Sequence, residues 1–103
     1  MIRLESYPRR RAQIIAQQAS DTTILLSLEN GQYYTLNEVG GRVWSLCDGS
    51  RRVTDMVAMI QQEYEVPAET IEADVLELLE ELIHEQLVVD GSYETAGGTE
   101  APA

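Results

Sequence analysis

The sequence has little of what a secreted or membrane-spanning protein needs. Among its 103 residues there is one cysteine, Cys47, so no intramolecular disulfide can form. A lone cysteine fits a reducing compartment, and we predict a cytoplasmic protein. No apolar run approaches the roughly 20 residues that span a bilayer. Residues 1–11 also lack the apolar core of a secretory signal. We therefore expect no membrane partner.

The residues that catalysis requires are also scarce. His84, the single histidine, falls on the polar side of its predicted helix and is expected at the surface. Cys47 has no evident base to activate it and is expected to be a small buried apolar residue. No Gly-rich phosphate loop is present, and acids on the same helix point apart rather than towards one metal. We predict no enzyme activity, no catalytic residue, no metal and no cofactor.

Lysine is absent, and all seven basic residues are arginines that precede Val53. Thirteen of the eighteen acids follow Arg52, and the formal net charge is -11. A chain with this charge repels phosphate backbones and favours cationic partners. We therefore expect no nucleic acid partner.

The length allows one domain with one modest core. We expect residues 1–11 to be an N-terminal lead-in, in which Arg9–Arg11 form a solvated, flexible end. Residues 12–90 form the expected folded domain. The small and polar residues of 91–103 predict a disordered tail.

Three strands are predicted first. Residues 13–19 are compatible with a strand, and residues 22–28 alternate clearly in side-chain type. The Asn30-Gly31 pair tolerates the positive φ angles of a tight hairpin, and residues 32–36 return as the third strand. The result is a three-stranded antiparallel meander.

Three helices follow. Asn37 should cap the first, which runs to about Cys47, and the Gly40-Gly41 pair suggests that another backbone approaches it closely. Thr54 should cap the second helix, and Pro67 suits the first turn of a third that reaches about Gln86. Residues 88–89 add a last extended piece. We predict an α+β fold that is winged helix-turn-helix-like.

The third helix has an unusually wide apolar surface, so one flank could line a groove. The alternatives are that the small sheet covers all of it or that a homodimer does. Asp74, Glu81 and Glu85 border the apolar surface, which is formed by Ile71, Val75, Leu76, Leu78, Leu79, Leu82 and Ile83.

The third strand is an edge of the meander, and its unpaired backbone groups can template an incoming extended peptide. Leu36 must reach the core, so the two-residue period places Tyr34 beside it and Tyr33 and Thr35 on the other face. Ordinary strand packing is the alternative explanation for the tyrosines. The first strand is an edge as well, and the pattern alone does not choose between them.

Two segments, "YYTLNEVGGRVWSLCDGSRRV" and "IEADVLELLEEL", resemble the PqqD-like family, also called RiPP precursor peptide recognition elements. The resemblance covers roughly residues 12–89. It implies three strands followed by three helices and no catalysis. It further implies binding of the leader of a ribosomally made precursor peptide, which is presented to a modifying enzyme such as a radical S-adenosylmethionine protein or a leader peptidase.

In this family the leader lies as an extra strand against the third strand, in the cleft beside the third helix. Carried over, the resemblance implies a peptide site at Gln32, Tyr33, Tyr34, Thr35, Leu36, Asp74, Val75, Leu78, Glu81 and Leu82. The alternative is an acidic winged-helix regulatory domain that acts through DNA or a protein. The absence of Lys and Arg from the third helix argues against the DNA form, because DNA affinity depends heavily on such contacts.

Overall fold

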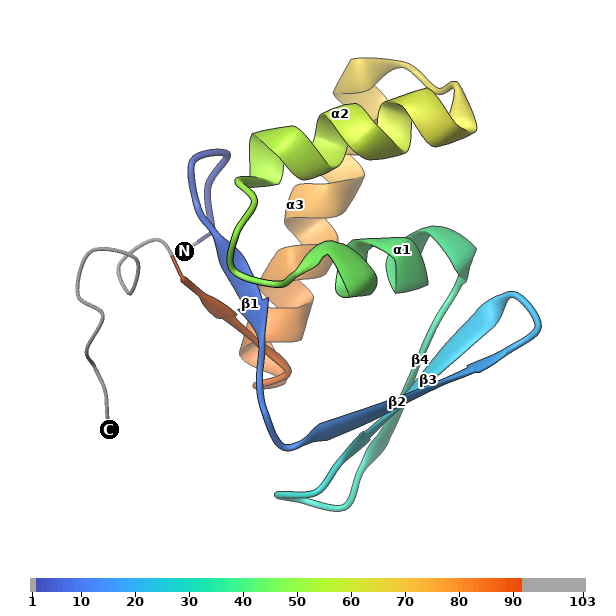
Figure 1. Ribbon diagram of the computed structural model, residues 1–103, viewed down its shortest axis with the longest axis vertical. Coiled ribbons are helices and arrows are strands. Elements are labelled where there is room, and N and C mark those ends of the chain that lie inside the picture. The colour runs from blue at the N-terminus through green and yellow to red at the C-terminus, as the bar shows by residue number, and fades with distance from the viewer. Residues whose placement is uncertain (1, 92–103) are drawn as a thin grey trace.

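The computed structural model describes residues 2–91, which adopt an α+β fold (Figure 1). A three-stranded sheet precedes three helices, which confirms the predicted architecture, and a pair of short strands joins the two ends of the described chain. The elements are β1 (Pro8–Arg10), β2 (Ile14–Ala19), β3 (Thr22–Ser27), β4 (Tyr33–Leu36), α1 (Glu38–Leu46), α2 (Val53–Tyr64), α3 (Ala68–His84) and β5 (Val88–Asp90). The predicted disordered tail lies outside the described residues except for Gly91.

The main sheet is an antiparallel meander in the order β2-β3-β4, so β2 and β4 are its two edges. Gly31 has φ 73°, the positive value expected of the Asn-Gly turn, and Gln32 N–H donates to Asn30 Oδ1 at 2.9 Å. The register places Tyr34 opposite Leu25 and Leu36 opposite Thr23. β4 leads directly into α1, so the turn and the helix cap fix this edge strand at both ends.

The cap of α1 is as predicted, whereas that of α2 is not. Asn37 Oδ1 accepts a hydrogen bond from Gly40 N–H at 2.8 Å. α2 begins at Val53, one residue before the predicted cap Thr54, and the Asp55 carboxylate accepts from the Arg52 N–H at 3.1 Å. Thr54 instead donates its hydroxyl to Leu4 O at 3.1 Å. The N-terminal segment thus uses the hydroxyl that was expected to cap the helix.

α1 crosses β3 closely at Gly41. The expected close approach exists, but the neighbour is a side chain rather than a backbone, because a Cβ on Gly41 would collide with Thr23 Oγ1. Thr23 is buried in the sheet and cannot easily move aside.

Gly41→Ala should therefore destabilise the protein. Alanine favours a helix by about 1 kcal/mol over glycine, but overpacking in a filled site costs about 1–3 kcal/mol. We expect a net loss of about 1–2 kcal/mol in the free energy of unfolding, measured by urea denaturation. The same change in a Thr23→Ala background should be neutral or stabilising, and an equal loss in both backgrounds would rule out the collision.

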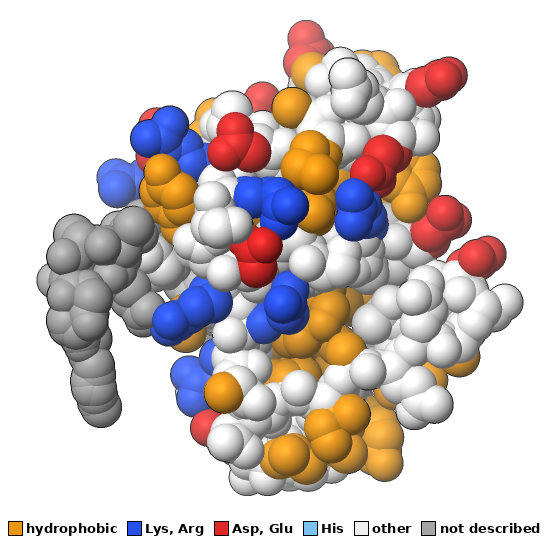
Figure 2. Space-filling view, in the orientation of Figure 1, with side chains coloured by type: hydrophobic (Ala, Val, Ile, Leu, Met, Phe, Trp, Pro, Cys, Tyr) orange, Lys and Arg blue, Asp and Glu red, His pale blue; other side chains and the backbone are white. Residues whose placement is uncertain are grey.

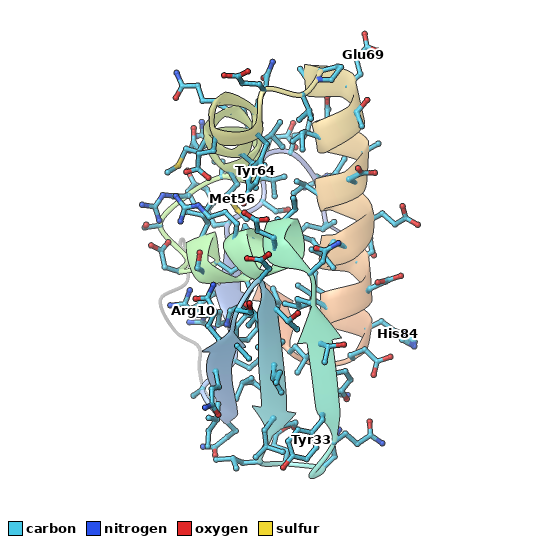
Figure 3. The ribbon with its side chains drawn as sticks, turned by 90° about the vertical axis from the view of Figure 1, so that its right-hand side faces the viewer. Arg10, Tyr33, Met56, Tyr64, Glu69 and His84 are labelled. Carbon is cyan, nitrogen blue, oxygen red and sulfur yellow. The ribbon has the colours of Figure 1, made fainter. Side chains whose placement is uncertain are left out.

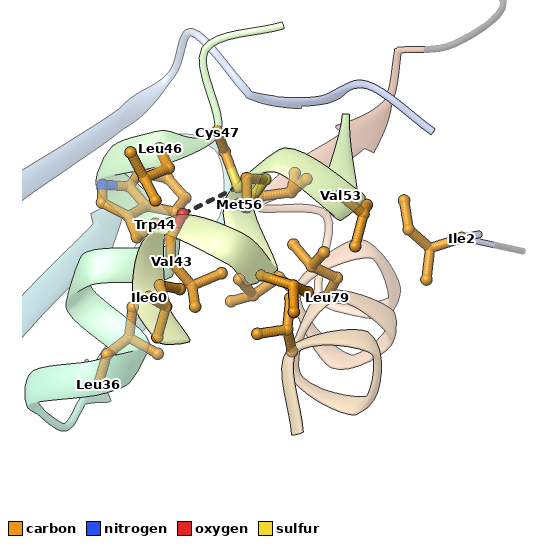
Figure 4. Packing of buried hydrophobic residues seen from close by; sticks show 14 of the residues in the cluster. Ile2, Leu36, Val43, Trp44, Leu46, Cys47, Val53, Met56, Ile60 and Leu79 are labelled. Atoms are coloured by element: carbon orange, nitrogen blue, oxygen red, sulfur yellow. Dashed lines mark hydrogen bonds between the residues drawn. The ribbon is translucent and has the colours of Figure 1, made fainter. Parts of the chain in front are cut away.

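One hydrophobic core lies between the three helices and the sheet (Figure 4). α3 contributes Ile71, Val75, Leu79 and Leu82, which are all buried. Cys47 is fully buried and its thiol donates to Val43 O at 3.2 Å, so the prediction of a small buried apolar residue is confirmed. Burial raises the pKa of the Cys47 thiol to about 12.

Cys47 should consequently be almost inert in the native protein. The thiolate is the reactive form, and at pH 8 both the raised pKa and burial suppress attack. We expect a disulfide reagent such as DTNB to react at least about 100-fold faster with urea-unfolded protein than with native protein. Because Cys47 is the single cysteine, the absorbance reports this site alone, and comparable rates would contradict its burial.

The N-terminal segment packs on the domain, and strand β1 was not predicted. Residues 8–10 pair antiparallel with β5, in the register Pro8 opposite Asp90. Ile2 is buried in the core, and the Arg10 guanidinium donates to the carbonyls of Trp44 and Ser45 at 3.2 and 2.9 Å. The expectation that the arginine run is a flexible solvated end is therefore wrong for Arg10, which holds the last turn of α1.

Candidate functional site: a groove between β4 and α3

The backbone of β4 alternates between its neighbour and its open edge. Ser27 N–H donates to Gln32 O at 3.0 Å, and Leu28 N–H donates to Gln13 O at 2.9 Å, so odd residues of β3 bond towards β4 and even residues towards β2. In an antiparallel ladder the direction changes at each residue. With Tyr34 paired to Leu25, Tyr33 and Thr35 direct their N–H and C=O groups towards the open edge.

The side chains of β4 alternate as predicted. Leu36 is buried and Tyr34 half-buried, whereas Tyr33 and Thr35 are exposed. Tyr34 donates its hydroxyl to Gln32 Oε1 at 3.0 Å, which fixes the phenol along the strand. β4 therefore has an open backbone edge, and its side chains Tyr34 and Leu36 point towards the core beside that edge.

α3 runs beside this edge and forms the opposite wall of a groove (Figure 3). Two adjoining hollows share Thr35, Leu36, Leu78 and Glu81. The first lies towards α1 and measures about 630 Å³. The second lies towards the C-terminal end of α3 and measures about 660 Å³. Leu78 stands between them and is half-buried, so the sheet does not cover the whole apolar surface of α3.

Each hollow has an apolar floor and an acidic rim. Val39, Val43, Ile71 and Val75 line the first, with Asp74, Glu77 and Glu81 beside them. Tyr34, Leu82 and Leu87 line the second, with Glu80, Glu81 and Glu85. All four of these rim glutamates and Asp74 are exposed. The groove thus suits an extended chain that carries apolar side chains with cationic neighbours.

Eight of the ten predicted site residues line these hollows. They are Tyr34, Thr35, Leu36, Asp74, Val75, Leu78, Glu81 and Leu82. Gln32 precedes β4 and Tyr33 begins it, and neither residue lines a hollow. Val75 and Leu82 are buried, so they form the floor of the groove rather than its contact surface.

Sequence reasoning missed the residues that close the first hollow from above. Tyr64, Val66 and Thr70 come from the end of α2, the connection and the first turn of α3. Tyr64 donates its hydroxyl to Glu38 Oε2 at 3.3 Å, and desolvation, followed by the Glu38 charge, raises the pKa of this phenol. The apolar pair Tyr64 and Val66, which flanks a turn, was the available signal. His84 lines the second hollow and is exposed, as expected.

Within residues 2–91 no group of three or more His, Cys, Asp or Glu side chains could hold a metal ion. In the same residues no helix is long and apolar enough to cross a bilayer.

A three-stranded meander followed by three helices, with one sheet edge open beside α3, defines a small winged helix-turn-helix-like α+β domain. Residues 22–88 match the family described as Coenzyme PQQ synthesis protein D (PqqD). The match spans more than half of the chain, so the chain belongs to the PqqD family, as the resemblance predicted. No curated protein matches it significantly.

Solved structures of similar proteins share this fold. TbiB1, in complex with the TbiA(beta) leader peptide, is 31% identical with a TM-score of 0.71, over 78% of this chain and 93% of that one. A lasso peptide synthetase B1 complexed with the leader peptide is 23% identical, with a TM-score of 0.71, over 81% of this chain and 98% of that one.

The PqqD truncation of Methylobacterium extorquens PqqCD is described as a functional, stand-alone RiPP recognition element. It is 22% identical with a TM-score of 0.74, over 86% of this chain and 95% of that one.

Proposed function

We propose that this chain is a non-catalytic module that binds the leader of a ribosomally made precursor peptide by strand addition to β4. The observation that carries this proposal is the open edge at Tyr33 and Thr35, which borders an apolar groove walled by α3. The leader complex of the 31% identical TbiB1 supports it. The ten predicted residues, from Gln32–Leu36 and from α3, form the proposed contact set.

Backbone pairing alone is too weak to account for such binding. Tyr33 and Thr35 offer two N–H and two C=O groups, worth roughly 0.5–1.5 kcal/mol net for each bond. Association costs about 4–15 kcal/mol in lost freedom, plus side-chain ordering. Each Leu, Ile or Val of the peptide buried in a hollow would add roughly 1.5–3 kcal/mol. The edge therefore sets the register, and the hollows provide most of the affinity.

The module would present the leader to a modifying enzyme in the cytoplasm. A radical S-adenosylmethionine protein or a leader peptidase is the expected class of partner. The proposed recognition domain covers residues 12–90, and the structure adds that residues 2–11 pack against it through Ile2 and β1.

An NMR titration tests this function directly. The probe is a synthetic leader peptide, with a scrambled peptide of the same composition as its control. Amide signals of residues 32–36 and of residues 74–82 should shift with the leader and not with the scrambled peptide. Shifts confined to β2 or α2 would place the binding site elsewhere.

A further inference from the structure

The three-stranded sheet carries large apolar side chains on both of its faces, including the face turned away from the helices. Thr23, Leu25 and Ser27 of β3 are buried towards α1, since Thr23 adjoins Gly41. The alternate residues Ile24 and Leu26 are half-buried on the opposite face, which we call the outer face. An antiparallel sheet with one covered face usually has polar residues outside, so apolar residues on the outer face as well call for an explanation.

The outer face carries an apolar row that crosses the whole sheet. The register aligns Ile15, Leu26 and Tyr33 in one row across all three strands. Ile15 is 51%, Leu28 55% and Tyr33 70% exposed, the largest exposures among the described large hydrophobic residues. Figure 2 shows hydrophobic side chains gathered in the lower part of the view, over the sheet. Contiguous apolar patches of this kind mark interaction sites, whereas isolated exposed residues do not.

The outer face is also free of charge, in contrast to the chain as a whole. The three strands contain no charged residue. Asp21 lies in the turn after β2, and Glu29, after β3, is paired with Arg11 at 3.0 Å. By contrast α3 exposes Glu69, Asp74, Glu77, Glu80 and Glu81, and the residue after it, Glu85, is exposed as well. The residues at outward positions are Ile15, Gln17, Ala19, Thr22, Ile24, Leu26, Leu28, Tyr33 and Thr35.

We propose that the outer face binds a second copy of this chain, with two sheets packed face to face across a two-fold axis. Two copies of net charge -11 repel each other, and the uncharged outer face allows apolar contact without desolvating a carboxylate. A two-fold axis lays the apolar row of one copy on that of the other. The outer face of one copy, apolar and uncharged, is therefore complementary to the same face of a second copy.

The contact is small, which makes the dimer reversible. Stable interfaces bury about 800 Å² on each partner, and three strands of 4–6 residues cannot reach far beyond that. The dimer therefore forms with rising concentration. It uses the face of the sheet, whereas strand addition uses the edge of β4, so a bound peptide and a second copy do not compete for backbone groups.

Sedimentation velocity of the full chain at increasing concentration tests this inference. Two neighbouring exposed residues give a matched pair of variants. Gln17 lies opposite Ile24 on the outer face, and Gln18 lies opposite Thr23 on the covered face. Gln17→Glu should weaken association by at least about tenfold, because like charges juxtaposed in the contact cost several kcal/mol. Gln18→Glu adds the same charge and should leave the dimer intact.

A second variant removes apolar surface without adding charge. Ile15→Thr with Leu28→Gln should also abolish the dimer at concentrations where the native chain forms it, with circular dichroism confirming the fold. Raising salt should strengthen the dimer, because it screens the repulsion between two acidic chains. The proposal would be overturned if the native chain stays monomeric at millimolar concentration. It would also be overturned if Gln17→Glu and Gln18→Glu weaken the dimer equally, or if neither weakens it. None of these results depends on peptide binding.

Discussion

Thr35→Pro should weaken leader binding by at least about tenfold while the domain stays folded. The Thr35 N–H points to the open edge, so proline removes a donor from the proposed peptide ladder and none from the bond network with β3. One lost bond accounts for about 1 kcal/mol, and the proline ring obstructs the incoming strand as well. Each 1.4 kcal/mol corresponds to a factor of ten in Kd, which isothermal titration calorimetry measures.

Two control variants make this result specific to the β4 edge. Ala16 in β2 occupies the equivalent outward position on the opposite edge, so Ala16→Pro should leave leader binding unchanged. Tyr34→Pro removes a bond to β3 instead and should lower the free energy of unfolding. If Ala16→Pro abolishes binding and Thr35→Pro does not, the peptide uses β2. If both bind normally, strand addition is untenable.

The elements that position the site could be predicted because their signals are local. An Asn-Gly turn, a strand with period two and an Asn cap follow one another within residues 30–40, and each restricts the chain on its own. The apolar surface of α3 is likewise a property of one segment. Once β4 and α3 are placed side by side, Leu36 and Leu78 line the same groove.

The features that were missed depend on contacts between distant segments. β1 is a three-residue strand, Pro-Arg-Arg, without any alternation, and its partner β5 lies at the other end of the described chain. The Thr54 hydroxyl donates to the carbonyl of Leu4, a residue 50 positions earlier, so it does not cap α2. Alternation in β3 predicted a strand but could not say which face would be covered, because both faces carry large apolar residues: Leu25 is inside, and Ile24 and Leu26 are outside.

The apolar floor of the groove and its charged rim act at different stages of binding. Apolar contacts form only once the peptide is seated, whereas the field of the exposed acids acts before contact. Affinity that depends on the floor should therefore change the dissociation rate. The rim should change the association rate, and only for a peptide with Lys or Arg near this wall.

Leader binding should accordingly weaken by roughly two- to tenfold as salt rises from low to high ionic strength, since exposed ion pairs contribute about 0.2–1 kcal/mol each. Charge attraction is screened over about 8 Å at physiological ionic strength. Asp74 and Glu81 line the groove, so Asp74→Asn with Glu81→Gln should flatten this dependence. Stopped-flow association rates at several salt concentrations provide the measurement, and a leader with its Lys and Arg replaced by Gln should behave like the double variant.

The control is a second double variant of α3 that changes the net charge by the same amount. Glu69 and Glu72 do not line either hollow, so Glu69→Gln with Glu72→Gln should retain most of the salt dependence. Equal flattening by both pairs would assign the effect to the overall charge of -11 rather than to the groove wall. A salt-independent leader affinity would mean that recognition depends only on shape and strand pairing.

Duplex DNA should not bind at any salt concentration, because α3 bears no Lys or Arg to replace released counterions. Tight DNA binding would favour a regulatory domain instead.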